Sequence, residues 1–219
     1  TYYRCKETCG TGTSTTTEIQ IFVPTPFPGG NYTINNNLPT AGSNFNSFTA
    51  AVSAISCGIA GPVVFDVDPS SGPYTEQITL PATIGSNAVN TVTFNGNGRT
   101  LQFNSTNTAA RSIITLNGAD YITINDLVID GSAAAATYAW GILFTGGADY
   151  NTVSLCNIKT SITNTTSGNH YPIVFSNSQS AVGTAGNTGS YNTFQDNTFS
   201  GGYYGVYTYG TGVGSEQIG

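Results

Sequence analysis

The sequence predicts an all-β protein whose main part is a right-handed parallel β-helix with a short N-terminal capping helix. Three observations lead to this prediction. Only 7% of the 219 residues are charged, 13 Tyr and 11 Phe are present, and one short motif returns along the chain. Aromatic residues favour strands, Gly and Asn favour the turns between them, and a returning motif favours stacked, equivalent coils.

The N-terminal segment predicts two paired strands that belong to a separate module. Two alternating runs, residues 2–9 and 18–23, flank a turn rich in Gly, Thr and Ser, which is the pattern of a hairpin. Tyr3 lies two residues before Cys5, a spacing that resembles the tyrosine corner of an immunoglobulin-like sandwich. We therefore expect residues 1–23 to be the last strands of such a domain.

A linker and one long domain are expected to follow. Residues 24–30 are rich in Pro and Gly, which is typical of a linker between modules. The β-helix is expected over residues 31–219 and incomplete at its C-terminus, because the chain stops just after a strand-like run. The chain also begins without Met or an export signal, so we expect it to be a piece of a longer protein.

One helix is predicted near the start of the β-helix. Residues 45–55 follow Ser43 or Asn44 as the N-cap and carry apolar side chains at helical spacing. The apolar positions are Phe45, Phe48, Val52 and Ile55, and Cys57 and Gly58 end the helix. We expect the helix to cover the open end of the first coil, where unpaired backbone groups would otherwise bind other chains.

Short strands and a repeated motif are predicted from residue 61 onward. The strands expected in the β-helix are 31–34, 63–67, 74–80, 92–95, 100–103, 112–116, 121–124 and 127–129. The motif at residues 118–124 returns at residues 147–153 and, more loosely, at residues 189–194. Because the repeats are unevenly spaced, a solenoid with loops on one side is favoured over a propeller.

Alignment of the repeats predicts columns of like residues on successive coils. One column holds Thr91, Thr123, Thr152 and Thr193, beside an apolar column of Val92, Ile124, Val153 and Phe194. Further apolar columns hold Ile129, Ile158 and Phe199, and also Ile113, Ile142, Ile173 and Val206. Coils stacked about 4.8 Å apart place each side chain on its counterpart. A β-sandwich, the structural alternative, does not readily explain these columns.

Charge and hydropathy exclude two classes of partner. The formal net charge is −6, and no basic patch is present to predict nucleic-acid binding. The basic residues, scattered along the chain, are Arg4, Lys6, Arg99, Arg111 and Lys159. The apolar runs are far shorter than the roughly 20 residues of a membrane helix, so no membrane insertion is expected.

Four cysteines do not define a disulfide framework in a chain of this length. The candidates are a bond between Cys5 and Cys9, or a bond from Cys5 to a strand outside this chain. Either bond would require oxidising surroundings. Cys156 is expected to be a small buried apolar residue.

The carboxylates of Asp120 and Asp149 occupy equivalent positions on neighbouring coils. Their Cα atoms would lie about 5 Å apart, close enough for the two charges to shift a pKa or bind a cation such as Ca²⁺. The alternatives are a turn role, in which they cap backbone amides, and a catalytic acid. No Arg or Lys shares their column, and His170 is expected in an exposed loop without triad partners. We therefore predict no catalytic residue, no firm metal ligand and no cofactor.

Tyrosine is the other prominent residue type. Tyr121, Tyr150 and Tyr191 share one column, which fits either a stacked ladder or a platform for sugar rings. A second group lies near the C-terminus and is predicted to contact another copy of the protein or a glycan. Its members are Tyr203, Tyr204, Tyr207 and Tyr209.

Several segments together resemble the right-handed parallel β-helix modules, of the pectin-lyase-like fold, found in very large secreted bacterial surface proteins. The segments are residues 3–5 (YRC), 48–52 (FTAAV), 61–67 (GPVVFDV) and 116–123 (LNGADYIT), with the Pro/Gly linker after the first. The resemblance implies tandem immunoglobulin-like domains, a location outside the cell and type IX secretion. The calcium-and-Arg and paired-Asp motifs of the lyases and hydrolases with this fold are not matched.

The function expected from the sequence is that of a noncatalytic adhesin or fibre subunit. Its partners would be copies of itself, other surface proteins or extracellular glycans. The alternative is a β-helix that binds or cleaves polysaccharides, as a lyase or glycoside hydrolase, with Asp120, Asp149 and the neighbouring tyrosines lining a groove.

Overall fold

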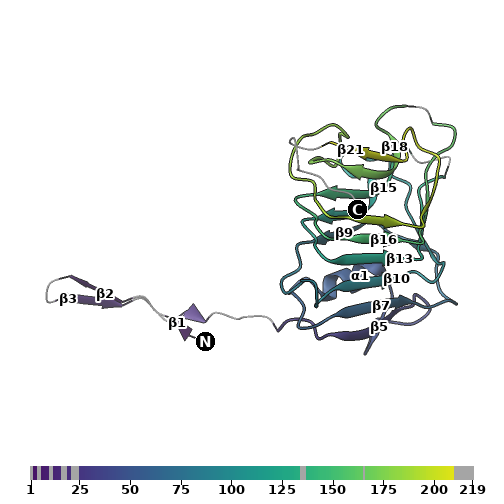
Figure 1. Cartoon of the computed structure of the whole chain (residues 1–219). Coiled ribbons are helices and arrows are strands. Elements are labelled where there is room, and N and C mark those ends of the chain that lie inside the picture. Colours follow the sequence, from purple (N-terminus) through teal and green to yellow (C-terminus); the bar gives the residue numbers. More distant parts are fainter. Residues whose placement is uncertain are drawn as a thin grey trace.

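The chain forms a parallel β-solenoid of about six turns (Figure 1). This computed structural model describes residues 25–133, 137–164 and 166–209, together with the backbone of residues 2–3, 6–9, 12–15 and 19–20. Each complete turn contributes one short strand to each of three parallel sheets. The predicted parallel solenoid is therefore confirmed, and the β-sandwich alternative is excluded.

The three sheets are numbered here in the order in which a turn visits them. Sheet 1 contains β5 (Gly30–Ile34), β6 (Asn44–Phe45), β7 (Val63–Val67), β10 (Val92–Asn95), β13 (Ile122–Asn125), β16 (Thr152–Ser154) and β19 (Thr193–Gln195). Sheet 2 contains β8 (Tyr74–Thr75), β11 (Thr100–Gln102), β14 (Val128–Asp130), β17 (Asn157–Lys159) and β20 (Thr198–Ser200). Sheet 3 contains β9 (Ile78–Pro81), β12 (Ser112–Asn117), β15 (Ala139–Thr145), β18 (His170–Phe175) and β21 (Val206–Thr208).

The core is built from inward-facing side chains that stack from one turn to the next. Sheet 1 stacks Phe65, Phe94, Ile124, Val153 and Phe194. Sheet 2 stacks Leu101, Ile129, Ile158 and Phe199, and sheet 3 stacks Ile114, Ile142, Ile173 and Val206. Burial of one such side chain contributes roughly 1.5–3 kcal/mol. The predicted apolar columns are confirmed from the coil of β13 onward.

Two predicted columns were wrong at their first member. In sheet 1 the partners of Thr123 and Ile124 are Thr93 and Phe94, rather than Thr91 and Val92. A shift of two residues leaves every side chain on the same face of a strand, so the alternation could not reveal the error.

In sheet 3 the partner of Ile142 is Ile114, rather than Ile113. Both Ile113 and Ile114 are buried, so the usual alternation that would identify the paired residue is interrupted. The strand predicted at residues 74–80 is also divided: β8 and β9 belong to different sheets, with a corner between them.

Helix α1 spans Phe48–Ala54 and begins three residues later than predicted. Its N-cap is Ser47, whose hydroxyl accepts a hydrogen bond from the Ala50 N–H at 3.0 Å. Phe45 lies in β6 instead, because it pairs with Ile34 at the end of sheet 1.

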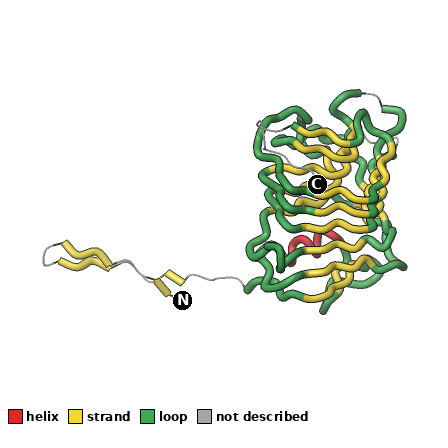
Figure 2. The backbone as a smooth tube through the Cα atoms, in the orientation of Figure 1, coloured by secondary structure: helices red, strands yellow, loops and turns green. Residues whose placement is uncertain are grey.

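The helix packs against β9 and β6, which are the end strands of sheets 3 and 1. Figure 2 shows it as the red segment among the strands of the first turns. The Glu76 carboxylate fixes its start by accepting hydrogen bonds from the N–H groups of Phe48 and Thr49, at 3.1 and 2.8 Å. The predicted short helix is thus present, and it packs against two edge strands, as a helix that protects a sheet edge would.

Antiparallel pairs of strands form in the N-terminal segment, and one of the two pairs joins the runs that the alternation predicts to pair. β1 (Tyr2–Tyr3) pairs with β4 (Ile19–Gln20), and β2 (Lys6–Cys9) pairs with β3 (Gly12–Thr15). The segment Gly12–Thr15, predicted as part of the turn, is therefore a strand. Phe27, within the predicted linker, already pairs with Ile59 and packs against the core of the solenoid.

The middle strands of sheet 3, β12, β15 and β18, are buried on both faces. The outer side chains of sheet 3 form a second apolar core of Trp140, Leu143, Tyr171 and Val174. A backbone carbonyl of the loop before β18, that of Gly168, accepts hydrogen bonds from Trp140 Nε1 at 3.0 Å and from Arg111 Nη1 at 2.6 Å. These bonds hold the loop against the outer face of sheet 3.

Candidate functional site

The corner that leads into sheet 1 brings Asp120 and Asp149 together, as the repeats predict. Asp120 Oδ1 accepts a hydrogen bond from the N–H of Asp149 at 2.8 Å, and Asp149 Oδ1 accepts one from the N–H of Ser190 at 2.7 Å. Each carboxylate thus caps the equivalent residue of the following turn. The pair was considered as a turn cap, a cation site or a catalytic acid. The observed hydrogen bonds are those of a turn cap.

The Asp120 carboxyl is held in a less polar environment than water. Burial raises its pKa, the hydrogen bond from the Asp149 amide lowers it, and the charge of Asp149 raises it again, with a net rise above the usual value. A catalytic acid commonly has a raised pKa. Here, however, the Oδ1 atom is already occupied by the backbone of the next turn.

Replacement of Asp149 separates the capping role from a cation-binding role. Asp149→Asn keeps an oxygen acceptor for Ser190, so we expect the free energy of unfolding to change by less than about 0.5 kcal/mol, whereas Asp149→Ala should lose about 1 kcal/mol. Urea unfolding of both variants, with and without Ca²⁺, measures these changes in the free energy of unfolding. A calcium-dependent stabilisation that Asp149→Asn abolishes would instead assign a cation to the pair.

The column of Tyr121, Tyr150 and Tyr191 is a stacked ladder beside these acids. The ring centroids are 5.1 and 4.9 Å apart, and the rings are within 5° and 7° of parallel. All three residues have left-handed backbone with φ between 56° and 59°, which is unusual for a bulky side chain. Since the rings face one another, the faces between them are not available to sugar rings.

A ladder of buried asparagines crosses the same corner. Asn151 Oδ1 accepts from the Ile122 N–H and Asn151 Nδ2 donates to the Ala119 carbonyl, both at 2.9 Å. In the next turn, Asn192 bonds the Asn151 N–H and the Ala148 carbonyl in the same way, at 2.9 and 2.8 Å. The sequence reasoning missed this role. The signal was the Tyr-Asn-Thr triplet shared by the last two repeats.

His170 is not in an exposed loop, contrary to the prediction. It begins β18, pairs with Ala139 and has 0% exposure. Neither ring nitrogen has a hydrogen-bond partner among the described residues. Burial lowers the pKa of its imidazole, and the nearby Thr137 carbonyl opposes this without making a hydrogen bond. Register pairing with a neighbouring turn placed His170 inside, which its polar sequence surroundings did not indicate.

The buried imidazole predicts a pH dependence of stability. Since the folded pKa lies below the ordinary value of 6.5, the unfolded chain takes up the proton first, and stability falls as the pH drops from about 6.5 towards the folded pKa. His170→Phe should flatten this part of the curve, because no other histidine is present in the chain. Urea unfolding between pH 7.5 and about 5 measures the free energy of unfolding of the wild type and of His170→Phe. If the free energy of unfolding fell equally with pH in both proteins, the pH dependence would not come from His170.

The tyrosines near the C-terminus lie around the last described turn. Tyr203, Tyr204 and Tyr209 are exposed, and Tyr207 packs against the second core. The Tyr203 and Tyr204 rings meet edge to face, at 90°. Their exposure agrees with a contact role, which stays a prediction.

The cysteines offer little chemistry where the structure describes them. Cys156 is buried, and burial raises the pKa of its thiol to about 11, so it behaves as the predicted small apolar residue. Cys57 is exposed and follows the end of α1. Cys5 lies outside the described residues, as does the side chain of Cys9, so the pairing stays a prediction.

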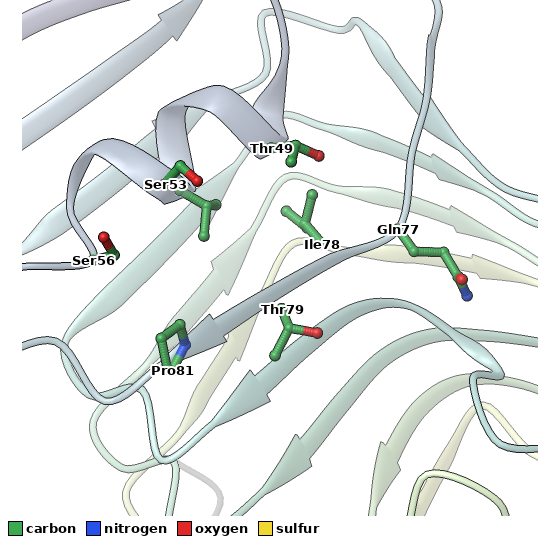
Figure 3. A pocket seen from close by; sticks show the side chains of 8 residues that line it. Thr49, Ser53, Ser56, Gln77, Ile78, Thr79 and Pro81 are labelled. Carbon is green, nitrogen blue, oxygen red and sulfur yellow. The ribbon is translucent and has the colours of Figure 1, made fainter.

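Two shallow grooves lie near the first turns. One, of about 270 Å³, runs between α1 and β9 (Figure 3), and its lining is mostly apolar, with Val52, Ile78 and Pro81 among its residues. The other, of about 380 Å³, lies on the outside of sheet 2 and includes Arg99, Gln102 and Asp130.

Comparisons with known proteins identify no established site. The chain matches no protein-family model, no curated protein and no solved structure. Among the described residues, no three His, Cys, Asp or Glu side chains gather where they could hold a metal ion. Within that same part of the chain, no helix is long and apolar enough to cross a membrane.

Proposed function

We propose that this chain is a noncatalytic structural or adhesive module of a large, secreted bacterial surface or fibre-forming protein. The observation that carries the proposal is that the acidic and tyrosine side chains considered as candidate site residues instead link one turn to the next. The carboxylates of Asp120 and Asp149 cap the next turn, and the phenols of Tyr121 and Tyr150 stack on it.

A stacked solenoid suits a spacer because every turn supports its neighbours in the same way. The outer face of sheet 1 continues this regularity with a column of threonines, Thr93, Thr123, Thr152 and Thr193. Such a module extends along one axis and presents repeated faces and loops for contact. Its contacts in the proposed role are with other copies or other surface proteins, through residues such as Tyr203 and Tyr204.

The finer features of the proposal rest on the sequence. The resemblance in residues 48–52, 61–67 and 116–123 supports a right-handed, pectin-lyase-like β-helix and type IX secretion. The spacing of Tyr3 and Cys5 supports a preceding immunoglobulin-like domain. A location outside the cell also accords with the expected oxidising surroundings for Cys5 and Cys9.

A second candidate function, polysaccharide binding, is favoured by the groove on sheet 2. Among the residues that the structure describes, Arg99 donates one hydrogen bond, from Nε to the Asn97 carbonyl at 3.4 Å, and its two Nη groups have no partner that would compete with a ligand. Asp130 lies in the same groove but is engaged by Ser132 and by Lys159, at 2.6 and 3.9 Å. A guanidinium fork of this kind suits a carboxylate or sulfate ester on a sugar chain.

Electron microscopy of the native protein tests the first proposal against the second. We expect filaments or surface fibres in which this module repeats, and no binding on an array of acidic polysaccharides. Dispersed particles together with array binding that Arg99→Gln abolishes would favour the second function. Thr198→Ala, on the outside of the same sheet but in the last described turn, is the matched control for that variant.

A further inference from the structure

We propose that the ladder of Tyr121, Tyr150 and Tyr191 is an oxidative cross-linking site, at which a one-electron oxidant joins neighbouring turns through dityrosine bonds. The proposal rests on the geometry of the ladder and is independent of the adhesive role.

The ladder holds three phenols close together and nearly parallel, and two of the three residues are exposed. The centroids are 5.1 and 4.9 Å apart, and the ring planes differ by only 5° and 7°. Tyr150 and Tyr191 are 47% and 51% exposed, although each ring is stacked on a neighbour. An oxidant can therefore reach phenols whose rings already lie against their coupling partners.

Hydrogen bonds to the backbone hold the neighbouring turns that carry the rings together. The Tyr121 N–H donates to the Asp149 carbonyl at 3.2 Å, and the Tyr150 N–H donates to the Ser190 carbonyl at 3.0 Å. The carboxylates of Asp120 and Asp149 tie the same turns together one residue earlier. The partners are thus held in place before oxidation, which favours coupling within one molecule over coupling between molecules.

Other close pairs of tyrosines in the described region lack this combination. The ring centroids of Tyr203 and Tyr204 are 4.9 Å apart, but the rings are perpendicular and the two residues are adjacent in sequence. Tyr204 and Tyr207 stack at 30° with centroids 6.3 Å apart, but they lie three residues apart in sequence. Tyr171 is fully buried, and its ring meets that of Tyr207 at 62°. The ladder alone among these pairs unites parallel stacking with exposure and links segments distant in sequence.

The chemistry needs an oxidant of the peroxidase class with hydrogen peroxide. Each of two phenols gives up one electron and its hydroxyl proton, and the peroxide is reduced to two molecules of water. The two tyrosyl radicals then form one carbon–carbon bond between the positions ortho to their hydroxyl groups. Both rings regain aromaticity as each ortho hydrogen moves to oxygen, so the protein loses two hydrogen atoms in total.

The Tyr150 phenol enters this reaction in the protonated form. Desolvation, followed by the charges of Tyr191 and Tyr121, raises the pKa of the Tyr150 phenol above its usual value. The solvent around this exposed side chain accepts the proton that leaves on oxidation.

Peptide mapping after oxidation of the dilute chain tests the proposal. Cleavage after Arg and Lys and before Asp places the ladder tyrosines in separate peptides, residues 120–125, 149–159 and 160–195. After treatment with a haem peroxidase and hydrogen peroxide, we expect the first to be linked to the second, and the second to the third, each with the loss of two hydrogen atoms. Fragmentation should place the links at the ladder tyrosines.

Tyr150→Phe is the decisive variant, because phenylalanine keeps a stacking ring but cannot form the phenoxyl radical. Both linked peptides should disappear, whereas the matched control Tyr204→Phe should retain them. In addition, the oxidised wild type should unfold at a higher urea concentration than the untreated protein, and oxidised Tyr150→Phe should not.

Two results would overturn the proposal. One is the persistence of ladder-linked peptides in Tyr150→Phe. The other is a wild-type product in which links through Tyr203 or Tyr204, or links between molecules, predominate over links within the ladder, because this would show that exposure alone decides where coupling occurs.

Discussion

Replacing Asn151 with alanine should lower the free energy of unfolding by about 2–6 kcal/mol, because two buried backbone groups would each lose a partner at a cost of about 1–3 kcal/mol. Asn151 is 1% exposed, and its amide bonds the Ile122 N–H and the Ala119 carbonyl. Alanine leaves both groups inside the corner with no replacement. The loss is large because the two backbone groups would be buried without a partner, and not because the bonds are unusually strong.

Urea unfolding followed by circular dichroism measures this loss. The matched control is Asn157→Ala, since Asn157 lies half-buried on the outside of sheet 2 in the same turn. That change should stay within about 0.5 kcal/mol of the wild type. A similar loss in both variants would show that the ladder of buried asparagines has no special role.

Replacing Phe144 with alanine should cost about 3–5 kcal/mol, the range typical of a large aromatic side chain removed from a core. Phe144 is fully buried in β15, in the middle of sheet 3. Its ring stacks on Phe175 with centroids 4.5 Å apart and meets Phe194 edge to face at 5.6 Å. Both packing and aromatic contacts to the next turn are therefore lost.

The same unfolding experiment tests this prediction. Ile162→Ala provides the control, because Ile162 is a large apolar residue that is 82% exposed, and its loss should change stability by no more than about 0.5 kcal/mol. A small effect of Phe144→Ala would mean that the turns around β15 rearrange to close the cavity. In that case the stacking of neighbouring turns would be less rigid than the structure indicates.

The two variants test different layers of the solenoid. Phe144 contributes to the apolar interior, which any closely packed sequence of suitable volume could supply. Asn151 contributes to the satisfaction of backbone groups at a corner, which requires an amide at one position. The comparison therefore separates the stability that comes from burial from the stability that comes from hydrogen bonds between turns.

The repeats in the sequence were informative because equivalent residues of stacked turns meet in space. Residues 118–124 and 147–153 are similar, and their alignment alone predicts that Asp120 lies beside Asp149 and Tyr121 beside Tyr150. The structure pairs the same residues. The first coils do not share the motif, so the alignment was less reliable there. The predicted register of β10 was therefore wrong by two residues.

Two residues were also predicted wrongly from the local sequence pattern. Phe45 fits the helical spacing of the residues after it, yet pairing with Ile34 places it in a strand. His170 follows a polar stretch that suggests an exposed loop, yet the pairing of β18 with β15 places it inside. In both residues, hydrogen bonding to a segment distant in sequence outweighs the local preference.

The sequence by itself determined that this chain stacks β-strand turns, because alternation sets the face of each side chain and repetition sets its neighbour on the next turn. Only the tertiary structure decided which residues cover the outer face of sheet 3 and that the single histidine is buried. These features depend on contacts such as that of Arg111 with Gly168, 57 residues away. Such contacts leave no periodic signal, because each occurs once and its geometry is set by the loops around it.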